Sequence, residues 1–106
     1  ELKLQAFDLI CVNLYNFSQA VSNALDLKAA VEEIDIGGPT MLRAGAKNFH
    51  SMLVIPEARF YPRLIQELED NNMCVSLGFR QEMAAYTFGL ISEYDKMISS
   101  YLGGDR

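Results

Sequence analysis

The chain has 106 residues, of which 50% are hydrophobic and 22% charged, values typical of one globular domain rather than a disordered chain. The formal net charge is −5 and no two Lys or Arg residues are adjacent, which excludes the basic stripe that nucleic-acid phosphates require. Its apolar runs fall short of the ~20 residues that cross a bilayer and no leader pattern opens the chain, so we expect a cytoplasmic protein with no nucleic-acid or membrane partner.

An apolar run near the beginning predicts the first strand. Residues 6–15 are almost continuously apolar, which is typical of a strand buried on both faces in the centre of a parallel sheet. Asn13 and Tyr15 lie at its C-terminal end, where open α/β sheets bind ligands. The chain opens at Glu1 rather than Met, and its first patterned segment is already a strand of the buried type. We therefore expect a further part of the domain upstream.

Two helices separated by a glycine-rich break follow. The first begins with Asp26 as a candidate N-cap and ends near Ile34, and the second has Pro39 in its first turn and ends near Asn48. Asp35 precedes the glycine pair at the start of the second helix, where backbone N–H groups and the helix dipole favour an anion. The local sequence alone favours an ordinary capping role for Asp35 over a role in chemistry.

The second helix carries two basic residues and an internal glycine. Arg43 and Lys47 share a helix face, which makes either a cationic patch toward a substrate or a solvated surface, and the local sequence favours the solvated surface. Gly45 costs about 1 kcal/mol relative to alanine inside a helix. A glycine at this position is explained either by ordinary helix packing or by the close approach of a ligand or another backbone.

The second half repeats the strand-then-helix order. Residues 51–55 predict a strand closed by Pro56, and an amphipathic helix follows with Pro62 in its first turn. Ser76 caps a long final helix that stops at Gly103. Apolar residues recur along it at three- and four-residue steps, and we interpret this aromatic stripe as core: Phe79, Met83, Tyr86, Leu90, Tyr94, Met97 and Tyr101. The alternation predicts an α/β fold with parallel strands, and with only two strands visible we expect others from a missing segment or another chain.

The cysteines and the single histidine indicate no metal or redox site. Cys11 and Cys74 lack CxxC spacing and a cluster of histidine partners, so we expect two reduced structural thiols. His50 has no neighbouring residues that suggest a triad or a metal site, and we expect it to be structural or exposed. The sequence therefore predicts a protein without metal or organic cofactor.

Three segments carry a resemblance to a known family. They are Val12-Asn13-Leu14-Tyr15-Asn16-Phe17, the run IDIGGPTM around Asp35-Ile36-Gly37-Gly38, and Arg43-Ala44-Gly45-Ala46-Lys47-Asn48. With the final helix, they resemble the inosine-monophosphate (IMP) cyclohydrolase domain of the bifunctional AICAR transformylase/IMP cyclohydrolase family, from about Asp8 to Leu102. The resemblance implies a methylglyoxal-synthase-like three-layer α/β sandwich with a parallel sheet. Residues 1–106 would be the C-terminal part of one such domain, without its N-terminal part.

The resemblance also implies an activity and a site. The family closes the formylated aminoimidazole-carboxamide ribonucleotide (formyl-AICAR, FAICAR) to IMP with loss of water. The matching positions make Lys47, Asp35 and Tyr15 catalytic and place Val12, Asn13, Ile36 and Gly37 against the nucleotide, with Lys47 as the proton-transferring residue. Ring closure needs an acceptor for the amide proton, a donor to the developing alkoxide and an acid for loss of water, and Asp, Lys and Tyr are suitable.

The sequence departs from the family at Asn16, where a proline is usual, and at Phe49, where a histidine is usual. A glycine-rich phosphate-binding turn and a further catalytic lysine lie upstream in the family and have no counterpart here. We expect a homodimer, and in the parent protein an upstream part of the domain and a downstream transformylase domain. Two alternatives stay open: a catalytically inert fragment or association module, and a methylglyoxal-synthase-like domain that binds a phosphorylated regulator.

Overall fold

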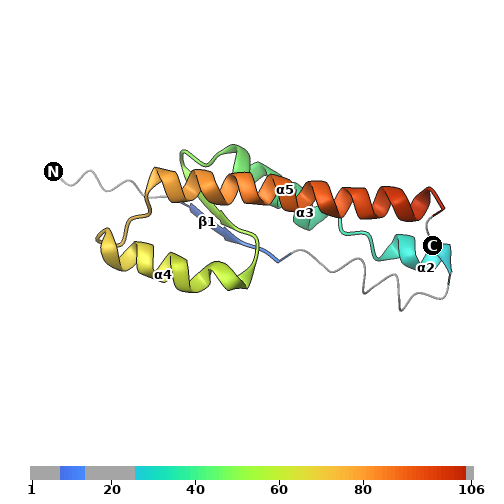
Figure 1. Cartoon of the computed structure of the whole chain (residues 1–106), viewed down its shortest axis with the longest axis horizontal. Coiled ribbons are helices and arrows are strands. Elements are labelled where there is room, and N and C mark those ends of the chain that lie inside the picture. Colours follow the sequence, from blue (N-terminus) through green and yellow to red (C-terminus); the bar gives the residue numbers. More distant parts are fainter. Residues whose placement is uncertain (1–7, 14–25, 105–106) are drawn as a thin grey trace.

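The computed structural model describes residues 8–13 and 26–104, which form an α/β fold (Figure 1). The α/β class predicted from the sequence is confirmed. The elements in chain order are β1 (Asp8–Cys11), α2 (Leu27–Glu32), α3 (Gly37–Lys47), β2 (Met52–Ile55), a short 3-10 turn (Ala58–Phe60), α4 (Tyr61–Asp70) and α5 (Leu77–Leu102).

The two described strands are parallel, as predicted. β1 pairs with β2 in a register that places Ile10 opposite Val54, and the pairing continues past the end of β1, where the Val12 N–H donates to the Ile55 carbonyl at 3.2 Å. α2 and α3 lie on the connection between the strands. A crossover of this kind is what parallel neighbours require.

The prediction that the first strand is buried on both faces is wrong for the part of β1 that the structure describes. Leu9 and Cys11 are exposed, whereas Ile10, between them, is half-buried. In β2, by contrast, Leu53, Val54 and Ile55 are all buried. Each strand has a single partner within residues 8–13 and 26–104, but no described element buries the Leu9 face of β1, so the strand that is covered on both faces is β2.

The helix boundaries follow the capping chemistry of the sequence. The Asp26 carboxylate accepts a hydrogen bond from the Ala29 N–H at 2.8 Å, and the Ser76 hydroxyl accepts one from the Phe79 N–H at 3.1 Å. Each side chain satisfies a backbone donor that the first turn of its helix leaves open. Pro62 lies in the first turn of α4, where its missing N–H costs nothing. These predicted starts are confirmed.

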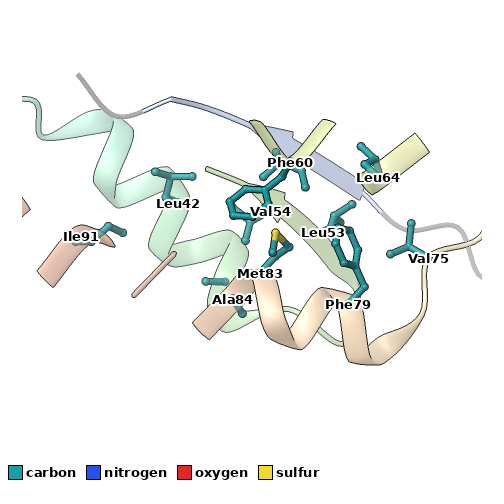
Figure 2. Packing of buried hydrophobic residues seen from close by; sticks show 12 residues of the cluster. Leu42, Leu53, Val54, Phe60, Leu64, Val75, Phe79, Met83, Ala84 and Ile91 are labelled. Carbon is teal, nitrogen blue, oxygen red and sulfur yellow. The ribbon is translucent and has the colours of Figure 1, made fainter. Parts of the chain in front are cut away.

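The core lies between the sheet and the long helix α5 (Figure 2). Phe79 and Met83 of α5 pack with Leu53 and Val54 of β2 and with Leu42 of α3 in one buried cluster. Most of the predicted aromatic stripe is buried, as expected for core, although Met97 is 39% exposed. Burial of this kind stabilises by roughly 25 cal/mol for each Å² of apolar surface removed from water.

Gly45 is explained by packing of α3 on the sheet. A Cβ at this position would lie 3.0 Å from Ile10 Cδ1 and 3.5 Å from Val54 Cβ, and Gly45 is buried. The missing side chain lets α3 approach the face of the sheet that carries these two residues. Of the two explanations that the sequence left open, helix packing is the one that this contact supports.

Candidate functional site

The direction of α3 places two predicted site segments at the same edge of the sheet. α3 ends at Lys47 and passes through residues 48–51 into β2, so the helix runs back against the strands (Figure 1). Its N-terminal end, with Ile36 and Gly37, therefore lies toward the carboxyl ends of the strands. Val12 and Asn13 follow β1 at that edge. Open α/β sheets bind ligands at this edge, and we call these segments together the carboxyl-edge site.

Asp35 begins the turn that leads into α3. Its Oδ1 accepts a hydrogen bond from the Gly38 N–H at 2.9 Å, and the contact is partly buried. The carboxylate thus satisfies one of the open donors of the first turn, as the local sequence indicated. A carboxylate has about four lone-pair positions, so this one bond leaves it able to accept a proton or hydrogen bond from a ligand.

Gly38 is required by the position of that carboxylate. A Cβ on Gly38 would lie 2.5 Å from Asp35 Oδ2, closer than two such atoms can approach, whereas a Cβ on Gly37 would meet nothing within 4 Å. The two neighbouring glycines therefore differ in what an added methyl group would do. Only the one at Gly38 displaces Asp35.

We expect Gly38→Ala to be less stable than Gly37→Ala by about 1 kcal/mol, the usual value of a side-chain cap. Both substitutions replace a flexible glycine in the first turn of α3 by alanine, so the stability that this replacement adds is the same in both variants and cancels in the comparison. Only Gly38→Ala forces the carboxylate off the helix start. Denaturant unfolding of the two variants in the same protein measures the difference, and equal midpoints would show that Asp35 does not cap α3.

Tyr94 of α5 holds the same turn from the other side. Its hydroxyl oxygen accepts a hydrogen bond from the Asp35 backbone N–H at 2.8 Å, across 59 residues of sequence. Tyr94 is 3% exposed, and this burial raises the pKa of its phenol. The hydrogen bond from the Asp35 N–H lowers the pKa and partly offsets the effect of burial. Helical periodicity assigns Tyr94 to the core stripe and does not indicate this contact. A buried tyrosine in place of phenylalanine was the available signal, because its hydroxyl usually finds a partner.

A second contact ties α3 to α5. Arg43 Nη2 lies 3.0 Å from Asp95 Oδ2, and both side chains are about half exposed. With Phe88, Ile91 and Ser92, this pair lines an open hollow of about 300 Å³. Arg43 therefore forms a surface ion pair with Asp95, and exposed pairs of this kind contribute at most about 1 kcal/mol.

Lys47 lies away from the carboxyl-edge site. It is the last residue of α3 and is exposed, and ten residues at ~1.5 Å each separate it from Gly37 by about 15 Å along the helix axis. The structure thus places Val12, Asn13 and the residues from Asp35 to Gly37 at the same edge of the sheet. It places Lys47 further along α3, two residues after the Gly45 that lies against Ile10 and Val54. Tyr15 lies outside the described residues.

Another polar cluster follows β2. Arg59 Nε lies 2.6 Å from Glu57 Oε1, and its Nη2 donates to the Tyr86 hydroxyl at 2.7 Å, which in turn donates to Glu57 Oε1 at 2.8 Å. The Arg59 guanidinium also lies over the Phe60 ring at 4.3 Å. These contacts join the turn after β2 to α5, and no pattern in the sequence predicted them.

The described part of the chain contains no group of three His, Cys, Asp or Glu side chains arranged to hold a metal ion. Both cysteines are free thiols. No helix within residues 8–13 and 26–104 is long and apolar enough to cross a membrane.

Comparison with known proteins places the chain in a family. The model of the family described as "AICARFT/IMPCHase bienzyme" matches residues 45–106, more than half of the chain. The chain belongs to this family. The match covers Lys47 and the whole of β2, α4 and α5, whereas the residues of the carboxyl-edge site precede it.

Relatives of the family extend the similarity over the carboxyl-edge site. The "Bifunctional purine biosynthesis protein PurH" of Trichormus variabilis is 44% identical over 105 residues, which are 98% of this chain and 21% of that protein. The protein of the same name from Microcystis aeruginosa is 46% identical over 100 residues, which are 93% of this chain and 20% of that protein. The chain thus spans about a fifth of the length of these relatives.

A solved structure supports the fold. The protein described as "Crystal structure of ForH" superposes with a TM-score of 0.76 at 29% sequence identity, over 91% of this chain and 50% of that chain. The family resemblance is therefore confirmed by the family model and the relatives, and the fold by this structure.

Proposed function

We propose that residues 1–106 are the C-terminal part of an IMP cyclohydrolase domain, and that the bifunctional protein containing it, here called the parent protein, closes formyl-AICAR to IMP. The similarity to proteins named for purine biosynthesis, over 98% of this chain in one relative, is the observation that carries the proposal. The carboxyl-edge site supports it, since Asp35 lies at a helix start on the ligand-binding edge of a parallel sheet.

In this proposal the nucleotide binds at the carboxyl-edge site. Val12 and Asn13 line it after β1, and Ile36 and Gly37 line it at the start of α3. The backbone N–H groups and the dipole at that helix start favour the negative charge that develops during reaction. Tyr15, in the segment that follows Asn13, is proposed as a further catalytic group.

Ring closure joins two groups of one molecule. The carboxamide nitrogen attacks the formyl carbon and loses a proton, and the formyl oxygen gains one to become a hydroxyl. That hydroxyl takes up a second proton and leaves as water, while the nitrogen that carried the formyl group loses its proton to form the C=N bond. Asp35 is the proposed acceptor for the amide proton, because its carboxylate is fixed at the helix start by Gly38. Since the reaction is intramolecular, holding the two groups in an attacking conformer supplies much of the rate, and well-oriented intramolecular reactions reach effective molarities of roughly 10⁵ M or more.

Lys47 remains the proposed proton-transferring residue. Its Cα lies about 15 Å along the α3 axis from that of Gly37, so in this proposal the Lys47 and Asp35 side chains act on different groups of the bound nucleotide. Substituting each residue separately therefore tests two independent parts of the proposed site. The proposed reaction uses no metal or organic cofactor.

We further propose that the parent protein has a transformylase domain downstream and acts as a homodimer. Several large apolar side chains are exposed, including Leu9 on β1, Ile36 and Met41 beside the start of α3, and Ile65 on α4. Surface of this kind needs cover from the upstream part of the domain or from a second copy. Analytical ultracentrifugation of the parent protein should give twice the mass of one chain, and a single-chain mass across the accessible concentrations would contradict the dimer.

A further inference from the structure

The turn that carries Asp35 is held by two hydrogen bonds of different origin. The Asp35 carboxylate accepts from the Gly38 N–H at 2.9 Å, three residues along the chain, and the Asp35 N–H donates to the Tyr94 hydroxyl at 2.8 Å. The first bond directs the side chain relative to α3. The second fixes the peptide of Asp35 relative to α5, so that together they set the place of the carboxylate in the fold.

Tyr94 is suited to fix that peptide. It is buried at 3% exposure and belongs to a small cluster with Ala30 of α2 and Tyr101 of α5, and Ile34 packs against the cluster. A side chain packed on both α2 and α5 cannot follow local motion of the loop between α2 and α3. Its hydroxyl is therefore a rigid acceptor for the Asp35 N–H.

We propose that Tyr94 is a positioning residue of the carboxyl-edge site, acting on the reaction through Asp35. The inference rests on the proposed function, because it concerns the carboxylate that the proposal uses as proton acceptor. Tyr94 does not touch the reacting atoms in this account. Its hydroxyl holds Asp35 where the amide proton leaves, and a misplacement of about 1 Å in such a group can lower the rate roughly a hundredfold.

Tyr94→Phe tests this with the smallest change that removes the acceptor. The ring that fills the cluster stays, and only the oxygen is lost. We expect kcat of the parent protein for formyl-AICAR to fall between about tenfold and a hundredfold, with KM changed less than kcat. Tyr86→Phe is the matched control: it removes a hydroxyl from the same helix, one bonded to Glu57 and Arg59 rather than to Asp35, and should change kcat by less than about twofold.

A double-mutant cycle separates positioning from a general loss of structure. If Tyr94 acts through the Asp35 carboxylate, Tyr94→Phe should lower kcat little further once Asp35→Asn has been introduced, because coupled residues are not additive. If the two residues acted independently, the fold-losses of kcat in Tyr94→Phe and Asp35→Asn would multiply in the double variant. A full additional loss in the Asp35→Asn background overturns the proposal.

Hydrogen exchange gives a readout that does not depend on activity. The amides of Asp35 and Gly38 in the parent protein should exchange faster in Tyr94→Phe than in the wild type or Tyr86→Phe. Unchanged exchange together with unchanged kcat overturns the role of Tyr94 even if Asp35→Asn abolishes turnover. The proposed function fails if the wild-type parent protein forms no IMP or if Asp35→Asn turns over normally. The catalytic role of Tyr94 then fails with it, and the exchange data report only whether Tyr94 holds the turn.

Discussion

Lys47→Ala in the parent protein should lower kcat for ring closure by roughly a hundredfold or more, the usual cost of removing a proton-transfer group. The stability of the protein should change little, because the Lys47 side chain is exposed in the last turn of α3. The favourable interaction of a cation with a helix C-terminus contributes only about 0.3–1 kcal/mol. Steady-state kinetics and thermal unfolding of the same preparation measure the two effects.

Two further variants show what Lys47 contributes. Lys47→Arg keeps the charge and its interaction with the helix end, but a guanidinium does not release its proton at neutral pH, so this variant should also be inactive. Lys96→Ala removes an exposed lysine of α5 and should retain normal turnover. Near-normal kcat in Lys47→Ala would remove Lys47 from the site and confine the chemistry to the carboxyl edge. Activity in Lys47→Arg would show that charge, not proton transfer, is what matters.

Asp35→Asn should also lower kcat by roughly a hundredfold or more, since an amide cannot accept the proton that leaves the carboxamide nitrogen. Asparagine keeps the oxygen that accepts from the Gly38 N–H, and asparagine and aspartate cap helices about equally well. The free energy of unfolding should therefore change by no more than about 0.5 kcal/mol. The substitution therefore separates the contribution of the Asp35 charge to turnover from the contribution of its capping hydrogen bond to stability.

Asp26→Asn is the matched control for Asp35→Asn. Asp26 caps α2 through the same kind of bond, to the Ala29 N–H, and has no place in the proposed reaction. Its amide variant should turn over normally. If Asp35→Asn also keeps near-normal turnover, or loses turnover only in proportion to lost folded protein, capping is the whole role of Asp35.

The features that the sequence predicted correctly depend on neighbours close in the chain. The caps at Asp26 and Ser76, the proline in the first turn of α4 and the contact of Asp35 with Gly38 each join residues no more than four apart. Their chemistry is therefore visible in a short stretch of sequence. The parallel strands were predictable because alternating strands and helices leave few other arrangements.

The features that the sequence did not predict depend on distant neighbours. Leu9 has the apolar character of a buried strand residue, but its burial is decided by what covers that face of β1, and it is 49% exposed here. The bond between Asp35 and Tyr94 joins residues 59 apart, and helical periodicity alone assigned Tyr94 to the core.

The separation of Asp35 from Lys47 could have been anticipated but was not. Both residues belong to one compact motif, which suggested a single site, whereas an uninterrupted helix from Gly37 to Lys47 places its ends about 15 Å apart. Proximity in a motif indicates shared membership of a family more directly than it indicates contact in space.

Conversion of formyl-AICAR by the parent protein and its Asp35→Asn variant, followed by mass-resolved detection of the nucleotide product, shows whether the carboxyl edge of this sheet is a cyclohydrolase site. The account predicts that the wild-type protein forms IMP, 18 mass units lighter than the substrate because water is lost, and that equally folded Asp35→Asn forms it roughly a hundredfold more slowly or slower still. A folded wild-type protein that forms no IMP, or an Asp35→Asn variant that forms it at the wild-type rate, would contradict a cyclohydrolase site at the carboxyl edge of this sheet.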